Sequence, residues 1–163
     1  MVKLENDVLD PRAFRNVVGN FSTGVTVITT KNEVGNPIGF TANSFTSLSL
    51  DPKLVLFNID KNSSNYDVFM NTNYFAINVL ASDQTGISKQ FSTRGIDRFE
   101  GVAYFEDTSG SPILPETIAY LDCKVSTHYE GGDHIIVIGE VLSGEANPNK
   151  EPLIFFKGKY LNA

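Results

Sequence analysis

The order of apolar and polar positions begins with one amphipathic segment. A stripe at helical spacing follows residue 10 and consists of Phe14, Val17, Val18 and Phe21. Asp10 is a natural N-cap, and Pro11 suits the first helical position. This pattern predicts an amphipathic helix that stops near Gly24.

Most later apolar segments are short and β-branched or alternating, which is typical of strands. The predicted strands are 24–31, 38–44, 45–50, 53–60, 74–80, 102–106, 118–130, 134–142 and 153–160, and 38–50 forms either one long strand or two with a kink. The run Ser64 to Asp67 resembles a capping box and predicts a short helix to about Asn71. Ser82 is the predicted cap of another helix that reaches Gln90. Short elements and frequent turns favour a mainly β fold, a β-barrel with a few short peripheral helices.

Length and charge narrow the class of protein. The 163 residues fit a single domain, 1–163. A net charge of -6 argues against a nucleic-acid surface, so an anionic ligand would need a local cluster of the 13 Lys and Arg residues. No apolar run approaches the roughly 18 residues of a membrane helix, and the charged start MVKLENDVLD does not resemble a secretory signal. The single cysteine, Cys123, excludes an internal disulfide and favours a reduced, cytoplasmic setting.

The stretch GFTANSFTSLSLDP, residues 39–52, combines hydroxyl and amide groups with large apolar side chains. Its polar members, Thr41, Asn43, Ser44, Thr46, Ser47 and Ser49, offer both donors and acceptors. Such a mixture on a strand suits a flat ligand with a polar edge. The alternative is a strand that is rich in cross-strand Thr and Ser pairs.

Three further groups could bind a ligand. Lys61, Ser63 and Ser64 precede a predicted helix N-terminus and could hold a phosphate, although an ordinary N-cap beside a surface lysine has the same pattern. The loop FSTRGIDRFE, residues 91–100, supplies Arg94 and Arg98, which could close over a ligand or remain solvated. His134 follows a Gly-Gly-Asp turn and could orient a substrate or simply face solvent.

Several common site patterns are absent from the sequence. It has no G-x-S-x-G motif, no metal-ligand spacing, no G-x-G-x-x-G and no P-loop. We therefore expect no metal site, and any dinucleotide is not expected in a Rossmann crevice.

Taken together, the chain resembles the short-chain flavin reductase family. The segments that carry the resemblance are FSTGVTVIT, GFTANSFTSLSLDP, LVLFNIDKNSSNYDVF, YFAINVL, QFSTRGIDRFEG, GGDHIIVIGEV and PLIFFKGKY. The resemblance implies an FMN-binding split β-barrel of Greek-key type and a homodimer with flavin near the subunit interface. It also implies reduction of FMN or FAD by NADH or NADPH, and a separate flavin-dependent monooxygenase as partner.

The resemblance also assigns site residues by position. The flavin ring and ribityl chain would lie along the segment that contains Thr41, Ala42, Asn43, Ser44, Phe45, Ser47, Leu48 and Ser49. Lys61, Ser63 and Ser64 would be near the phosphate. The ribityl-phosphate side would be covered by Phe91, Ser92 and Arg98, and His134 would position the nicotinamide.

Two other functions remain open on the sequence alone. The same barrel could serve as a flavin-binding redox carrier or sensor without nicotinamide activity, or as a dimeric interaction module that has lost flavin. The intact hydroxyl-rich strand argues against an interaction module that has lost flavin. The candidate dimer surfaces are the apolar stripe of the first helix and the segment Leu153 to Phe156.

Overall fold

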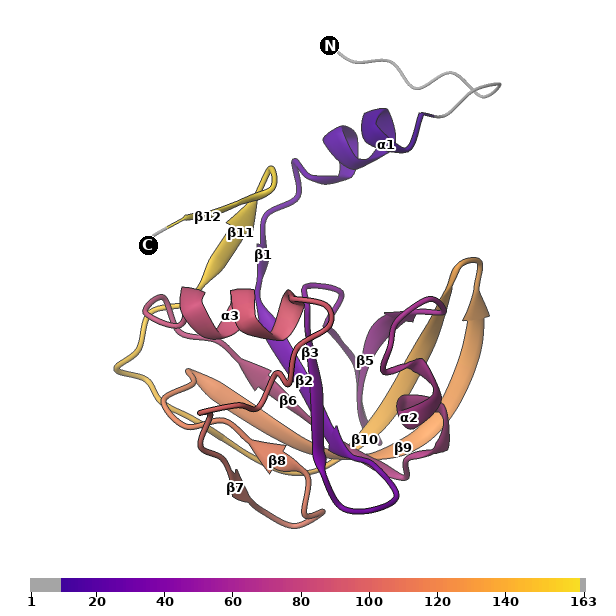
Figure 1. Cartoon of the computed structure of the whole chain (residues 1–163), viewed down its shortest axis with the longest axis vertical. Helices are drawn as coiled ribbons and strands as arrows, with labels where there is room; N and C mark the ends of the chain where they lie inside the picture. The colour runs from indigo at the N-terminus through magenta and orange to yellow at the C-terminus, as the bar shows by residue number, and fades with distance from the viewer. Residues whose placement is uncertain (1–9, 162–163) are drawn as a thin grey trace.

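The computed structural model describes residues 10–161. Residues 1–9, which hold most of the charged start of the chain, lie outside the described residues. A seven-stranded antiparallel sheet dominates the fold (Figure 1). Its order is β3 (Pro37–Ala42), β2 (Thr26–Lys31), β6 (Tyr74–Val79), β9 (Ala119–Gly131), β10 (His134–Ala146), β5 (Lys53–Asp60) and β4 (Thr46–Leu50). The predicted mainly β fold with few helices is confirmed.

Three helices and two small sheets complete the described part of the chain. The helices are α1 (Pro11–Val18), α2 (Tyr66–Asn71) and α3 (Thr85–Ser92). The small sheets are β1 (Thr23–Gly24) with β11 (Ile154–Phe156) and β12 (Lys159–Leu161), and β7 (Phe105–Glu106) with β8 (Pro112–Ile113). Helices α2 and α3 lie against the body of the molecule, whereas α1 projects away from it (Figure 1).

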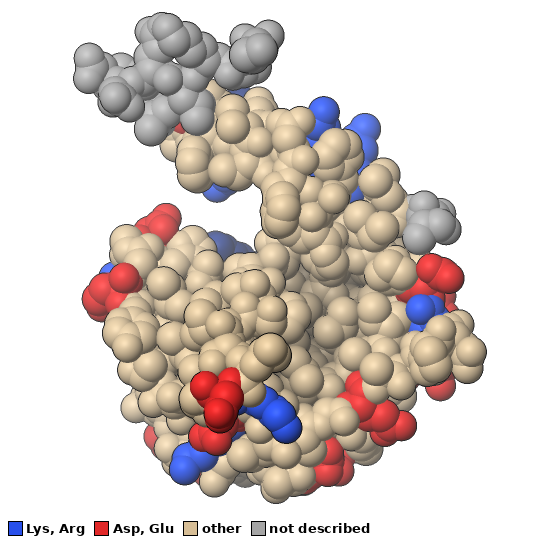
Figure 2. All heavy atoms as spheres, turned by 180° about the vertical axis from the view of Figure 1, so that it is seen from behind, with Lys and Arg blue, Asp and Glu red and all other residues tan. Residues whose placement is uncertain are grey.

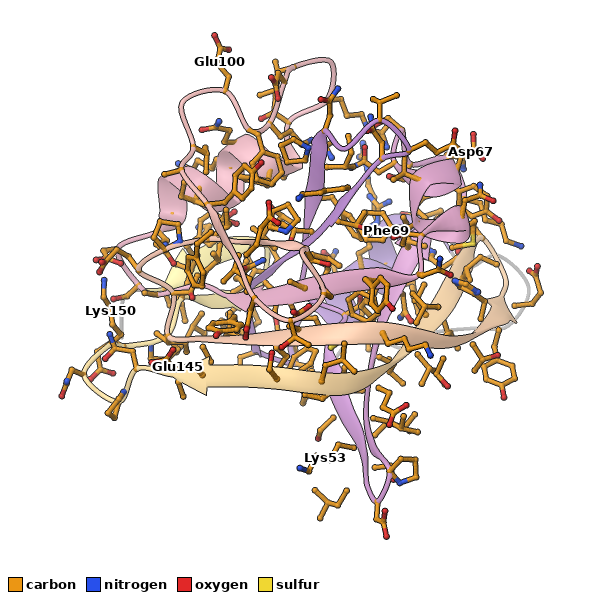
Figure 3. The ribbon with its side chains drawn as sticks, turned by 90° about the horizontal axis from the view of Figure 1, so that it is seen from below. Lys53, Asp67, Phe69, Glu100, Glu145 and Lys150 are labelled. Carbon is orange, nitrogen blue, oxygen red and sulfur yellow. The ribbon has the colours of Figure 1, made fainter. Side chains whose placement is uncertain are left out.

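Apolar side chains are buried on both faces of β2. Ile28 faces a cluster that contains Phe57, Phe69 and Phe75, in which the rings of Phe57 and Phe75 meet edge to face at 5.0 Å. In Figure 3, Phe69 points from α2 into this interior. Val27, the next residue along the strand, faces a second cluster beneath α3. Because successive strand residues point to opposite faces, β2 is buried on both sides, and its five buried residues, Thr26 to Thr30, are all β-branched.

The helix boundaries differ from those predicted. Helix α1 ends at Val18 rather than near Gly24, because the side-chain amide of Asn20 donates to the carbonyl of Asn16 and the chain then extends into β1. The capping box at Ser64 does not form: Asn65 occupies the N-cap of α2, and its side chain bonds to the carbonyl of Gly39 instead. A tertiary contact therefore replaces the local cap.

The second predicted cap is also wrong. Helix α3 begins at Thr85, three residues beyond Ser82, and Gln84 is its N-cap residue. The side-chain oxygen of Gln84 accepts from the backbone N–H of Ala81 at 3.0 Å, which fixes the chain before the helix. Because α3 extends to Ser92, Phe91 and Ser92 are helical rather than part of the predicted loop.

The strand predictions are closest in the middle of the chain. Segment 53–60 is correct at both ends, and 38–50 forms two strands with a break between them. Only Phe105–Glu106 of segment 102–106 is a strand, and β10 continues four residues beyond the predicted end at 142.

The C-terminal segment 153–160 is a hairpin rather than one strand. Strands β11 and β12 pair across Lys157 and Gly158, which have φ values of 50° and 77°. Two consecutive residues with positive φ are typical of a type I′ turn, which glycine favours at its second position. The turn reverses the chain, so Tyr160 returns beside Phe155.

The single cysteine is part of the main cluster. Cys123 on β9 is fully buried, and this burial, together with the charge of Asp122, raises the pKa of its thiol to about 12. The thiol is therefore protonated and inaccessible at neutral pH.

Candidate functional site

One cavity joins segments that are far apart in the sequence. It has a volume of about 310 Å³ and lies where β3 and β5 end, α2 and β10 begin, and α3 gives way to the following loop. Its walls are formed by Phe40, Thr41, Ala42, Asn43, Ser44, Asn58, Ile59, Asp60, Ser63, Ser64, Phe91, Ser92, Arg94, Arg98 and His134. The structure thus brings ten of the predicted site residues to one place.

The hydroxyl-rich segment is anchored on both sides of its kink. Thr41 donates its hydroxyl proton to the carbonyl of Ser88 in α3 at 2.7 Å, so its oxygen can only accept a hydrogen bond from a ligand. Ser44 accepts from the backbone N–H of Asn58 at 2.9 Å and donates to the carbonyl of Asn58 at 3.3 Å. These bonds fix β3 against α3 and the kink against β5.

Asn58 is a wall residue that the sequence reasoning missed. Its side-chain oxygen is buried and has no hydrogen-bond partner within residues 10–161. An unsatisfied buried polar atom is costly, so an amide left in this state beside a cavity fits a site that receives polar ligand groups. The available signal was the single amide within the apolar strand KLVLFNID.

Two arginines supply positive charge to the cavity. Arg98 donates from Nε to the carbonyl of Thr93 at 2.8 Å and from Nη1 to the carbonyl of Gly39 at 2.9 Å. Burial and the nearby charge of Arg94 lower the pKa of Arg98. The two like charges disfavour each other, and a bound anion would relieve that repulsion.

Gly39 lets α3 approach the sheet at this point. A Cβ atom at Gly39 would lie 2.9 Å from the Phe91 ring and 3.1 Å from the carbonyl oxygen of Ile28. The missing side chain therefore allows the Phe91 ring to rest on β3 and form the apolar end of the cavity.

Of the three residues that were predicted to lie near the phosphate, the structure places two in the cavity and one outside it. Ser63 and Ser64 line the cavity, and the Ser63 hydroxyl oxygen accepts from the backbone N–H of Asn65 at 3.2 Å. Lys61 does not line it: its ammonium group pairs with Glu130 of β9, and this hydrogen bond raises the pKa of Lys61. The arginines, rather than the lysine, are thus the cations that share a cavity with the two serines.

His134 stands at the rim of the cavity, on the first residue of β10. It pairs with Asp60 across the sheet, and its Nδ1 lies 2.7 Å from a carboxylate oxygen of Asp133. This hydrogen bond lowers the pKa of Asp133. The hydrogen bond at Nδ1 orients the imidazole ring. Because 43% of the His134 side chain is exposed, the rest of the ring is accessible to a ligand.

The remaining predicted residues lie apart from the cavity. Phe45 packs against the main apolar cluster, and Ser47, Leu48 and Ser49 belong to β4, where the pairing with β5 is irregular. Their contact with a flavin stays a prediction. Within residues 10–161, the structure has no group of three or more His, Cys, Asp or Glu side chains that could hold a metal ion, and no helix of the length and apolarity needed to cross a bilayer.

Comparison with known proteins identifies the kind of site. The sequence profile described as "Flavin reductase like domain" matches residues 18–163. The chain belongs to this family. The predicted family and its enzyme class, a flavin oxidoreductase, are thereby confirmed.

Individual relatives cover most of the chain. It is 41% identical over 94% of its length to the flavin-dependent monooxygenase reductase subunit HsaB of Rhodococcus jostii, covering 78% of that protein. It is 42% identical over 91% of its length to the FMN reductase (NADH) SmoA of Agrobacterium fabrum, covering 84% of that protein. Among curated relatives the share covered extends from 93% down to 42%, so at least one relative is more than twice as long.

A solved structure supports the same assignment. The NADH:FAD oxidoreductase SgcE6 of Streptomyces globisporus is 35% identical and superimposes with a TM-score of 0.87 over 96% of both chains. This structure was determined in complex with NAD and FAD fragments.

Proposed function

We propose that this chain reduces FMN or FAD with NADH or NADPH by direct hydride transfer and supplies the reduced flavin to a flavin-dependent monooxygenase. The observation that carries the proposal is the single cavity in which the hydroxyl-rich strand, two arginines and a rim histidine meet. The names of the relatives support both the reduction of flavin and its supply to a monooxygenase, because they include an FMN reductase (NADH) and a monooxygenase reductase subunit.

The cavity walls suit a flavin phosphate. Phe40, Ala42, Ile59 and Phe91 provide apolar surface, and the unsatisfied oxygen of Asn58 provides an acceptor beside it. Arg94, Arg98, Ser63 and Ser64 provide donors for a phosphate. This division into apolar and cationic parts matches a ligand with a flat ring and an anionic tail.

When both cofactors are bound, they supply the chemistry, which is hydride transfer from nicotinamide C4 to flavin N5. The contribution of the chain is to orient its ligands and exclude water. Thr41, held by α3, presents only an acceptor, and Ser44 fixes the strand that carries Asn58. The main requirement is to hold the two reacting atoms within about 3–3.5 Å.

His134 is proposed to position the nicotinamide. Its Nδ1 is held by Asp133, so the ring has a fixed orientation at the open side of the cavity. No other cavity group suggests a dedicated proton donor at this rim, and bulk water can protonate the reduced product. His134 therefore acts as a positioning residue rather than as a general acid.

The proposed homodimer is supported by apolar surface that the chain leaves uncovered. In α1 no residue is buried, and Phe14 and Val18 are about half exposed. On the sheet, Leu56, Ile136 and Ile138 share the face opposite Phe57 and belong to neither buried cluster. Viewed from the side on which the β4–β5 hairpin projects, the surface between α1 and that hairpin carries few charged side chains (Figure 2).

This sheet face adjoins the cavity, because Asn58 is directly opposite Ile136 in the pairing of β5 with β10. A second copy that covers the face would also close one side of the flavin site. The predicted surface at 153–156 is less suitable, since Leu153 is fully buried within its own chain.

Three broader features belong to the same proposal. We also propose that residues 1–163 form a single domain and that the fold is a split barrel, with which the seven-stranded sheet and its separate edge strands β3 and β4 agree. A cytoplasmic location agrees with one buried cysteine and no opportunity for an internal disulfide.

Oxidation of NADH and NADPH in air, with FMN, FAD and riboflavin as acceptors, tests the proposed activity. The expected result is flavin-dependent loss of absorbance at 340 nm (a property of reduced nicotinamide) with at least one flavin. Tight flavin binding without oxidation of either nicotinamide would favour a redox carrier or sensor. Failure to bind any flavin would contradict both functions.

A further inference from the structure

The turn between β9 and β10 lies beyond the paired part of the neighbouring strand. Strand β5 ends at Asp60, directly opposite His134, and the turn precedes His134. It contains Gly131 and Gly132, and Gly132 has a φ of 77°. Because glycine loses more conformational freedom on folding than other residues, such a turn gains order from contacts outside it. In Figure 1 the turn projects at the right-hand edge of the molecule.

Lys61, the first residue after β5, bonds to both arms of this hairpin. Its backbone N–H donates to the carbonyl of Asp133 at 3.0 Å, and its ammonium group donates to the carboxylate of Glu130. Glu130 belongs to the end of β9, whereas Asp133 directly precedes β10. A single residue therefore joins the two arms on either side of the glycines.

We propose that Lys61 clamps the β9–β10 turn and thereby fixes the position of His134. Lys61 is then a positioning residue, which acts on the nicotinamide through the histidine. The proposal rests on the proposed function, because it requires the nicotinamide to meet His134. It gives the lysine a role outside the phosphate site, in which its partner is a carboxylate of its own chain.

The connection from Lys61 to the imidazole passes through one residue. The carbonyl of Asp133 accepts from the backbone N–H of Lys61, and a carboxylate oxygen of the same Asp133 lies 2.7 Å from Nδ1 of His134. His134 also follows Asp133 directly in the chain. A shift of Asp133 therefore moves both the backbone and the ring of His134.

The charges around the turn agree with a clamp. The hydrogen bond with Glu130 is the main cause that raises the pKa of Lys61, and the charge of Asp133 acts in the same direction. The pKa of Asp133 is lowered chiefly by its hydrogen bond with His134, and the charge of Lys61 contributes. Because 78% of the Glu130 side chain is exposed, solvent screens the ion pair and we expect a modest effect.

The test combines steady-state kinetics for NADH with fluorescence titration of FMN. Glu130→Gln and Lys61→Met each remove one charge and keep a side chain of similar size, so the KM for NADH should rise about two- to fivefold. The dissociation constant of FMN should change by less than about threefold. Lys61→Arg keeps the ion pair and should stay within about twofold of the wild-type KM. Lys31→Met is the matched control, because Lys31 pairs with Glu106 at 2.6 Å and is similarly exposed.

Amide hydrogen exchange provides a second measurement that needs no turnover. The backbone N–H of residue 61 donates to Asp133, so its exchange rate reports how firmly the turn is held. Glu130→Gln leaves the sequence around residue 61 intact and should make this exchange about two- to fivefold faster. Lys31→Met should leave it unchanged.

The possible outcomes separate the clamp from the proposed function. A higher KM for NADH together with faster exchange in Glu130→Gln supports the clamp, whereas an unchanged value of either overturns it. A loss of FMN affinity in Lys61→Met without any effect of Glu130→Gln also overturns it, because Lys61 would then serve the phosphate. If the wild-type protein oxidises no nicotinamide but exchange at residue 61 still accelerates in Glu130→Gln, the reductase function fails and the clamp on His134 remains.

Discussion

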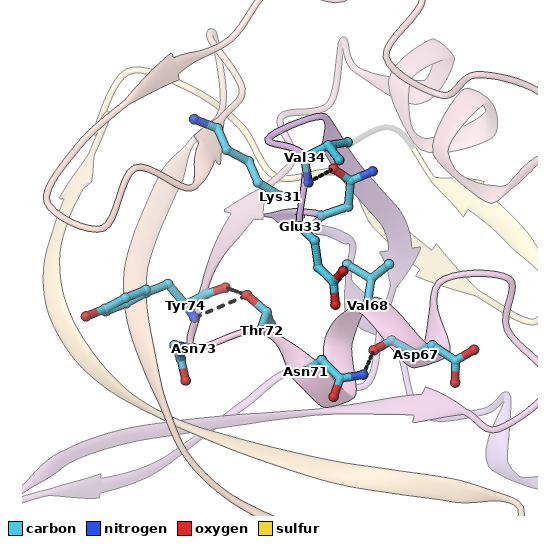
Figure 4. Close-up of a pocket in the computed structure, with 10 residues that line it drawn as sticks. Lys31, Glu33, Val34, Asp67, Val68, Asn71, Thr72, Asn73 and Tyr74 are labelled. Carbon is cyan, nitrogen blue, oxygen red and sulfur yellow. Dashed lines mark hydrogen bonds between the residues drawn. The ribbon is translucent and has the colours of Figure 1, made fainter.

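The two cavities near the two ends of α2 differ in whether their polar side chains are hydrogen-bonded within the chain. The larger, about 540 Å³, lies between the β2–β3 turn, the end of α2 and the start of β6 (Figure 4). There the Asn71 amide donates to the carbonyl of Asp67, the Thr72 hydroxyl donates to the carbonyl of Tyr74, and Lys31 pairs with Glu106. Several polar groups of this hollow are therefore already bonded within the chain.

The smaller hollow, in which we propose that flavin binds and which is called the flavin cavity below, leaves polar groups without internal partners. Among residues 10–161, the buried oxygen of Asn58 has no partner, and no carboxylate is bonded to Arg94 or Arg98, which face the same space. If the smaller hollow binds flavin, as we propose, volume alone is a poor indicator of a binding site. Unsatisfied polar groups that converge from separate elements are a better one.

The largest effect is expected at the exposed sheet face beside the flavin cavity. Ile138→Asp would place an unpaired charge in the proposed subunit interface, at a cost of about 3 kcal/mol or more, so dimerisation should weaken more than about a hundredfold. Sedimentation velocity at micromolar protein measures the change. Val34→Asp, beside the larger hollow, should leave the mass unchanged, and a wild-type monomer that still binds flavin tightly would contradict the interface.

A smaller effect is expected at Arg98, one of the two arginines of the flavin cavity. Arg98→Ala should weaken FMN by about ten- to a hundredfold through the loss of a charge-assisted contact of about 1.5–3 kcal/mol, and should affect riboflavin less. Fluorescence titration with both ligands measures the difference. Arg98→Lys separates charge from geometry, because lysine cannot make both carbonyl bonds. Tyr74→Phe in the larger hollow is the control, and an equal loss for FMN and riboflavin would place the phosphate elsewhere.

His134 tests whether the rim of the flavin cavity is functional. His134→Ala should raise the KM for NADH about three- to tenfold and lower kcat modestly, with a smaller change in flavin affinity. Steady-state kinetics with both substrates varied, on the Ala and Asn variants, provide the measurement. If kcat collapsed and the acid limb of its pH profile disappeared, His134 would instead be a proton donor. Wild-type constants in both variants would remove it from the site.

The smallest effect is expected at Lys61. Because the ammonium group of Lys61 is paired with Glu130, Lys61→Ala should weaken FMN binding by less than about threefold and leave riboflavin binding unchanged. Titration of both flavins in parallel with Arg98→Ala decides which cation serves the phosphate. A loss as large as that of Arg98→Ala would mean that Lys61 leaves Glu130 when flavin binds.

The sequence predicted the sheet better than the helix ends. Segment 53–60 could be placed correctly because Asp51-Pro52 interrupts the chain before it and the nearly continuous apolar run KLVLFNID follows. The caps of α2 and α3 could not be placed, because Asn65 bonds to Gly39 and Gln84 bonds to Pro115, both distant in sequence. Local cap patterns do not contain such tertiary partners.

The candidate site was predictable in its hydroxyl-rich strand and its arginine loop, which are contiguous in sequence. Asn58 and Asp60 were missed, because the cavity side of β5 depends on which face the other strands cover. Lys61 was included because it is next to Ser63 in sequence. Lys61 directly follows β5, and its side chain points toward Glu130 of β9 rather than into the cavity, which adjacency in sequence cannot reveal.

The buried cysteine has a practical consequence for labelling. Because the Cys123 thiol is enclosed and protonated at neutral pH, thiol-reactive dyes should leave the folded wild-type chain unmodified. A cysteine introduced at an exposed position such as Val34 would then be the single attachment point for a fluorophore. The natural sequence thus provides a background on which ligand-dependent distances can be followed by energy transfer without first removing a native thiol.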